Sequence, residues 1–178
     1  LNSAHLQWRK ALAKAAKTSI DRVTVHCVHQ HNAPFACLDT ETIILEQGDL
    51  PHIVELEFFQ QCLDSAQSAV RGALLRTTPI THISHGEAPV NQVAGNRRLI
   101  GLDGKVISQR GSSSRSAEHQ RYPEGLIDPM LKTVAFYNGD RKIVSSHYYA
   151  CHPMSYYGDG RVSADFCGLS RKQRQQQE

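Results

Sequence analysis

The sequence predicts a mixed α/β fold, in which helices pack on a β-sheet core and a polar site lies at the strand ends. The first observation behind this prediction is that helical and β-type patterns alternate along the chain. The second is size, because 178 residues with 40% hydrophobic residues can bury one core. We therefore expect a single α/β domain over residues 1–178, and the way the sequence begins and ends suggests that it is part of a longer protein.

Two segments have the pattern of helices. In residues 3–18, apolar side chains such as Leu6 and Leu12 recur at helical spacing while lysines and arginines occupy the other face. A second helix is expected from Pro51 to about Leu75, because proline favours the first helical position and basic residues come late. Between these helices, residues 29–50 are expected to form a long loop.

The remaining segments favour strands and turns. A buried strand is expected at 21–28 and a short strand at 79–84, because both are rich in β-branched residues. The pair 131–137 and 142–150 is expected to form a hairpin around Asn138-Gly139-Asp140. A tight turn is predicted at Asp103-Gly104, and residues 108–122 have the composition of a mobile insertion.

Two histidines, His29 and His31, follow the predicted strand 21–28 and precede Pro34. In an extended segment, residues i and i+2 face the same side, so both rings could reach one site at the strand tip. Neutral imidazole is the commonest metal ligand in proteins and also exchanges protons near neutral pH. The alternative is a polar strand end with two solvated histidines.

A third histidine, His152, ends the second strand of the predicted hairpin and precedes Pro153. This repeats the arrangement of His29 and His31 before Pro34. If the two strands end on the same side of one sheet, the three imidazoles converge at one site. The alternative is that His152 only caps a buried strand by hydrogen bonding.

Composition argues against several classes of protein. The net charge of +3 comes largely from residues 171–174, without the basic stripe and interleaved aromatics that nucleic-acid binders show. No run of 18 apolar residues is present, so we expect no transmembrane segment. The five cysteines lack Cys-x-x-Cys spacing, which argues against a zinc finger or a dense disulfide framework and leaves open a single bridge involving Cys27.

Four short motifs, in this order and spacing, resemble the amino-terminal domain of neutral/alkaline non-lysosomal ceramidases. They are His29-Gln30-His31-Asn32-Ala33-Pro34, Asn96-Arg97-Arg98, Ala150-Cys151-His152-Pro153-Met154 and Ser163-Ala164-Asp165-Phe166-Cys167-Gly168. The similarity extends from about Asp21 to Gly168.

The resemblance implies a zinc-dependent amidohydrolase that cleaves an N-acyl amide bond. Carried over by position, His29 and His152 become zinc ligands, His31 a proton-transfer residue, and Arg97 the cation that faces the carbonyl region of the substrate. The family's other two ligands, a Glu and a Tyr, come later in its sequence, so we expect little amidase activity from these 178 residues alone. Asp165 could orient a ligand histidine, or it could be a turn aspartate.

The sequence differs from the family around the implied ligands. Gln30, Asn32 and Ala33 replace Thr, Ser and Gly, and Met154 replaces the Thr expected after His-Pro. These changes favour an N-acyl substrate other than ceramide, either a small molecule or a lipid-like compound at a membrane surface. The resemblance also implies an extracytoplasmic location. The alternative is a non-catalytic binding or structural module that kept the fold without the metal.

Overall fold

The chain forms two compact units in the computed structural model, which describes residues 2–112, 114–158 and 160–177. Unit 1 consists of Leu1–Thr77 and Gly158–Ala164, and unit 2 consists of Thr78–Tyr157 and Asp165–Glu178. Helices and antiparallel sheets are both present, which confirms the mixed α/β class. That the two units act as a single domain stays a prediction.

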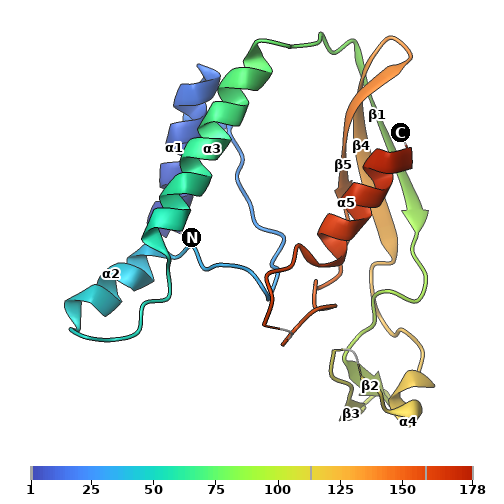
Figure 1. Cartoon of the computed structure of the whole chain (residues 1–178). Coiled ribbons are helices and arrows are strands. Elements are labelled where there is room, and N and C mark those ends of the chain that lie inside the picture. Colours follow the sequence, from blue (N-terminus) through green and yellow to red (C-terminus); the bar gives the residue numbers. More distant parts are fainter. Residues whose placement is uncertain (1, 113, 159, 178) are drawn as a thin grey trace. The chain divides into compact units, whose positions relative to one another are not determined.

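Unit 1 is helical. Its elements are α1 (Asn2–Ala16), the 3-10 turn η1 (Ile20–Arg22), α2 (Leu38–Glu46) and α3 (Leu56–Leu74). Helix α1 packs against α2 and α3 and lies beside α3 in Figure 1. The core forms where Phe59 meets Ala4 and Val54, and the Trp8 ring lies edge-on to Phe59 with the ring centroids 6.2 Å apart. Small side chains at buried positions of α1 allow this close helix packing.

The prediction of a strand at 21–28 is wrong. Residues 20–22 form η1, and residues 23–30 have no regular secondary structure. The Arg9 guanidinium donates hydrogen bonds to the carbonyl oxygens of Val23 (2.9 Å) and Ile20 (2.8 Å). Most of the run beyond Val23 is exposed, so water can satisfy its backbone groups without a partner strand.

The predicted bounds of the next elements also change. Helix α2 lies inside the predicted loop 29–50, and α3 begins at Leu56 instead of Pro51. The reason is Glu41 of α2, which is 1% exposed. Its carboxylate accepts hydrogen bonds from the backbone N–H groups of Ile53 and Val54, both at 3.0 Å, and so holds this segment outside the helix.

Unit 2 contains two antiparallel sheets. The larger has the strand order β1 (His82–Pro89), β4 (Met130–Asn138), β5 (Arg141–Tyr148); the smaller pairs β2 (Arg98–Ile100) with β3 (Val106–Gln109). Helices α4 (Ala117–Gln120) and α5 (Asp165–Gln177) complete the unit. The β4–β5 hairpin confirms the prediction, with Gly139 at a φ of 55° in its turn. The predicted turn at Asp103-Gly104 joins β2 to β3.

Two further sequence expectations are refined in unit 2. The short strand expected at 79–84 is part of β1, which begins at His82 and pairs with β4 from His82↔Tyr137 to Pro89↔Met130. Residues 108–122 include the end of β3 and the helix α4, whose start is capped by the Ser116 hydroxyl. Residue 113, which also belongs to that predicted insertion, lies outside the described residues.

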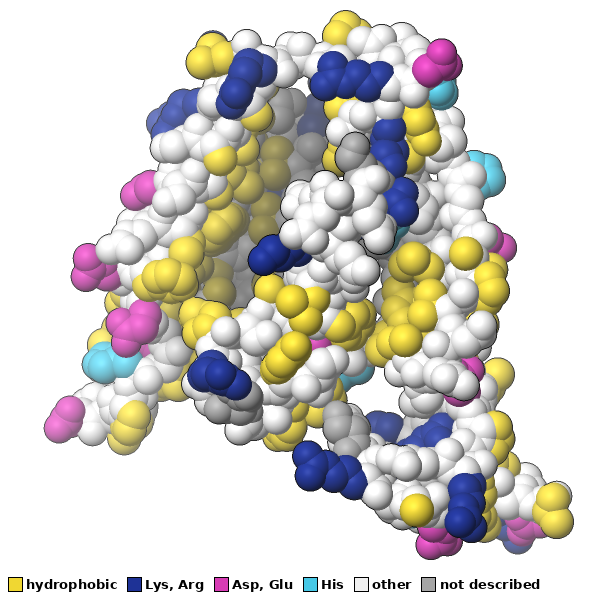
Figure 2. Space-filling view, turned by 45° about the vertical axis from the view of Figure 1, so that its right-hand side comes forward, with side chains coloured by type: hydrophobic (Ala, Val, Ile, Leu, Met, Phe, Trp, Pro, Cys, Tyr) yellow, Lys and Arg dark blue, Asp and Glu magenta, His cyan; other side chains and the backbone are white. Residues whose placement is uncertain are grey.

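The surface mixes apolar and charged side chains. Figure 2 shows yellow apolar groups between blue basic ones, and among the most exposed large apolar side chains are Leu75, Leu102 and Leu126. All five cysteines are free, so the single bridge that the sequence left open is not formed. In the described part of the chain, no helix is long and apolar enough to cross a membrane.

Candidate functional site

The His29–His31 pair of unit 1 lies in a loop, not at a strand tip. His29 adopts the left-handed backbone region with a φ of 60°, a conformation that histidine tolerates better than most residues. The two ring centroids are 4.9 Å apart with the planes at 75°, and ligand nitrogens of the two rings lie within 4.8 Å of each other. The two rings therefore come together because the backbone bends at His29. The sequence instead predicts that they face the same side of an extended strand.

A distant segment of the chain fixes this loop. The backbone N–H of Ser163 donates a hydrogen bond of 2.8 Å to the carbonyl oxygen of Asn32. Residues Gly158–Ala164, which contain Ser163, belong to unit 1, as do His29 and His31. The motif 163–168, identified from the sequence, thus begins against the motif that contains His29 and His31.

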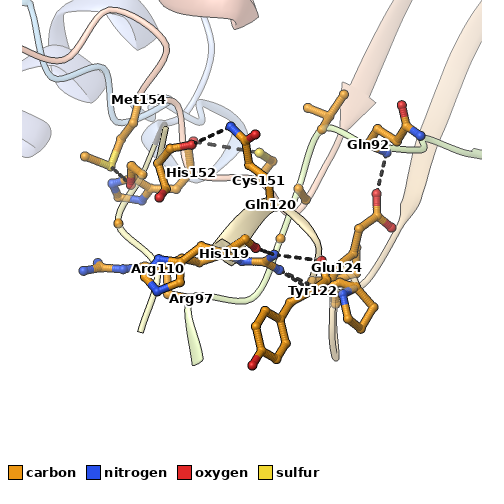
Figure 3. A pocket seen from close by; sticks show the side chains of 18 of the residues that line it. Gln92, Arg97, Arg110, His119, Gln120, Tyr122, Glu124, Cys151, His152 and Met154 are labelled. Carbon is orange, nitrogen blue, oxygen red and sulfur yellow. Dashed lines mark hydrogen bonds between the residues drawn. The ribbon is translucent and has the colours of Figure 1, made fainter. Parts of the chain in front are cut away.

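In unit 2, His152 and Arg97 line one pocket of about 1040 Å³ (Figure 3). Arg97 comes directly before β2, and His152 follows β5 after three residues of irregular chain. The structure thus brings two of the sequence-predicted site residues of this unit to one cavity, whereas the third, Asp165, is not among the residues that line it. Most of the other lining residues come from 91–127 and 150–155, and Phe166 of α5 also contributes. The lining from the two ranges includes Arg110, His119, Tyr122, Glu124, Cys151 and Met154.

Arg110 holds the pocket wall together, and sequence reasoning did not identify it. Its Nε donates to the Asn96 carbonyl at 3.0 Å, Nη1 to the carbonyls of His119 and Tyr122, and Nη2 to those of Pro123 and Glu124. Figure 3 shows these bonds converging on one guanidinium. Since a guanidinium has five N–H donors, Arg110 uses them all on backbone carbonyls. No sequence motif marks such a residue.

Arg97 is the cation of this pocket that remains available to a ligand. Its side chain is exposed, and among the described residues it makes no side-chain hydrogen bond or ion pair. The one carboxylate among the pocket-lining residues, Glu124, accepts a short hydrogen bond from the backbone N–H of Gln92. The His119 ring is positioned by the Ser108 hydroxyl, 3.4 Å from its Nε2. The pocket thus has positive character at Arg97.

Asp165 is buried at the start of α5, with 3% of its surface exposed. Its carboxylate accepts hydrogen bonds from the backbone N–H groups of Ser155 and Phe166. Burial alone would raise the pKa of Asp165, but these backbone hydrogen bonds together lower it below its ordinary value of 3.8. Asp165 therefore holds the backbone of Ser155, three residues after His152, in addition to bonding the first turn of its own helix.

Three described histidines, His29, His31 and His152, could hold a metal ion, because each offers one ring nitrogen. His29 and His31 belong to unit 1, and His152 belongs to unit 2. His29 and His152 are exposed and His31 is half-buried, so ring nitrogens are within reach of solvent ions. The sequence identified all three from their positions, with His29 and His31 shortly before Pro34 and His152 directly before Pro153.

No family model, curated protein or solved structure matches this chain. The resemblance to neutral/alkaline ceramidases therefore stays a prediction from four short motifs. Function has to be argued from the histidines, the pocket and the chemistry of their side chains.

Proposed function

We propose that this protein is a ceramidase-like, zinc-dependent amidohydrolase that cleaves an N-acyl amide bond. The observation that carries the proposal is the group of three histidines able to hold a metal ion. In this proposal His29, His31 and His152 bind zinc, and Arg97 faces the substrate. His31 is thereby assigned to the metal, in place of the proton-transfer role that the resemblance implies.

The chemistry of the donor set fits zinc. Catalytic zinc sites take three protein ligands, often imidazole nitrogens, and keep one position open. Three imidazole nitrogens together with one open position make up such a donor set. The group consists of histidines alone, and imidazole nitrogens are sufficient ligands for such a site.

The covalent path of the chain also supports the proposal. Ser163 is hydrogen-bonded to Asn32, next to His31. Two residues later, Asp165 binds the backbone of Ser155, which follows His152 by three residues. A single residue, Ala164, thus separates the residue bonded to the His29–His31 loop from the residue bonded to the His152 segment.

The side chains supply the other parts of an amide hydrolysis. When bound, zinc would supply Lewis acidity toward the amide carbonyl and a water of lowered pKa. Arg97 can donate hydrogen bonds to the carbonyl oxygen as negative charge develops on it. The apolar part of the same pocket, which includes Met154 and Phe166, can accommodate an acyl chain.

Zinc binding tests the proposal most directly. The full chain, stripped with a chelator and then titrated with Zn²⁺ by isothermal calorimetry, should bind about one equivalent. His152→Ala and His29→Ala should each weaken zinc binding by roughly 10-fold or more, because each removes one ligand. His85→Ala and His26→Ala are matched controls, since both histidines are exposed and lie outside the three-histidine group.

Two results would decide against an enzyme. Zinc affinity that is the same in His152→Ala as in the unchanged protein would remove the metal site. Tight zinc binding without release of amine from N-acyl amide substrates, in a longer protein that also supplies the later Glu and Tyr ligands, would instead favour the non-catalytic binding module.

A further inference from the structure

We infer that the pocket of unit 2 binds a carboxylate through Arg97, so that the substrates of the proposed hydrolase are N-acyl amino acids. This inference deepens the proposed function and rests on it for the identity of the scissile bond. Binding of the carboxylate itself rests only on the pocket, which lies wholly within unit 2.

The charge of the pocket favours a monoanion. Two guanidinium groups, those of Arg97 and Arg110, and one carboxylate, that of Glu124, line it. Because Arg110 spends its donors on backbone carbonyls, only Arg97 can pair with a ligand. A single planar guanidinium suits a carboxylate through two parallel hydrogen bonds, whereas a dianion would also meet repulsion from Glu124.

Polar groups near this cation can complete the binding of the ligand head. His119 and Ser114 line the pocket, and the His119 ring is held by its contact with Ser108. A guanidinium has five donors, so two N–H groups of Arg97 can bind the carboxylate while others face the amide oxygen of the same molecule. This arrangement suits a compound whose carboxylate lies a few bonds from its amide.

The remaining surface of the pocket suits an acyl chain. Apolar lining residues include Ala94, Ile127, Met154 and Phe166. Methionine adapts its shape to irregular aliphatic ligands. A carboxylate can form a charge-assisted pair with Arg97 and a neutral headgroup cannot, so the pocket favours an N-acyl amino acid over a neutral N-acyl amine.

Binding can be measured without hydrolysis. Metal-free full-length chain would be titrated with N-octanoylglycine and with N-octanoylglycinamide, two ligands that differ in the carboxylate alone. We expect the glycine compound to bind about 10-fold more tightly, as typical for one charge-assisted bidentate pair. Arg97→Gln should abolish this preference, and Arg97→Lys, which keeps the charge but not the fork, should reduce it.

Arg98→Gln is the matched control, because Arg98 is an adjacent exposed arginine that does not line the pocket. It should keep the full preference, and circular dichroism of each variant shows that the fold is retained. Equal affinity for the two ligands, or an unchanged preference in Arg97→Gln, would overturn the inference. If the unchanged protein prefers the glycine compound but does not bind Zn²⁺, the carboxylate-binding pocket is supported and only the proposed hydrolase is refuted.

Discussion

Asp165 receives the backbone N–H of Ser155 on both of its carboxylate oxygens, at 3.2 Å for Oδ1 and 3.1 Å for Oδ2. Asp165 has a left-handed backbone, with a φ of 53°, and follows directly after the segment 158–164 of unit 1. One buried side chain thus joins the start of α5 to the segment that carries His152. Its role is to position that segment.

Replacing this carboxylate should loosen the chain after His152. In Asp165→Asn one acceptor oxygen becomes an amide donor, so the N–H groups of Ser155 and Phe166 compete for a single oxygen. We expect the free energy of unfolding to fall by about 1–3 kcal/mol, measured by urea titration. Asp140→Asn, at an exposed position of the β4–β5 turn, should be near neutral. Equal stability of the two variants would show that Asp165 is not an anchor.

The Glu41–His52 contact predicts a loss of stability in acid. His52 Nδ1 lies 2.5 Å from Glu41 Oε1, and this bond, followed by the N–H of Ile53, holds the pKa of Glu41 below its ordinary value of 4.5. Since the pKa is lower in the folded state, the stabilisation is present above about 4.5 and is lost as the pH falls through the folded value. The urea concentration at the midpoint of unfolding should therefore decrease as the pH is lowered below about 4.5.

The variant Glu41→Gln isolates this contribution. It should be less stable than the unchanged protein at pH 7, because a neutral amide is a weaker acceptor for the N–H groups of Ile53 and Val54. The difference should shrink as the pH is lowered and Glu41 becomes protonated. Parallel pH profiles for the two proteins would show that Glu41 has no altered pKa.

Arg110 should be intolerant of conservative replacement. Lysine has three donors on a single nitrogen and cannot reach all the carbonyls that are arranged around the edges of the guanidinium. We expect Arg110→Lys to destabilise unit 2 by about 2–4 kcal/mol and to speed hydrogen exchange in β2 and β3. Arg121→Lys is the control, because the exposed Arg121 side chain makes no hydrogen bond to the described residues. Similar exchange rates in the two variants would refute this assignment.

Substitution of His31 tests whether this residue is a zinc ligand or a proton-transfer residue. If His31 binds zinc, His31→Gln should weaken zinc affinity about as much as His29→Ala. If it only transfers protons, zinc affinity should be kept while turnover of an N-acyl substrate falls by about 10²–10⁴-fold. Calorimetric titration with Zn²⁺, beside amine release, separates these two roles.

Sequence patterns predicted the parts of the fold that depend on neighbouring residues. The β4–β5 hairpin follows from the Asn138-Gly139-Asp140 turn between two β-type runs, and Gly139 adopts the positive φ that such turns require. The helix α1 follows from its periodicity, although Leu6, expected on the apolar face, is 43% exposed and small alanines are buried. Local signals thus located elements better than they located the core.

Other features depend on partners far along the chain. The β-branched run 23–28 forms no strand, because Arg9 satisfies the carbonyl of Val23 and no described strand pairs with the run. The start of α3 is set by Glu41, and the pocket wall by Arg110. For the candidate site, the sequence identified the histidines and Arg97 by residue type, but the left-handed backbone of His29 has no sequence signal.

Because the Asn32 carbonyl takes its hydrogen bond from Ser163, the helical unit incorporates a segment that is synthesised after nearly all of unit 2. During translation, the β4–β5 hairpin can form while the first helices still lack Gly158–Ala164. The bend that brings His29 and His31 together is then stabilised only in the last stage of folding. A nascent chain would therefore hold the proposed ligands His29 and His31 in their final arrangement only after Ser163 has been synthesised.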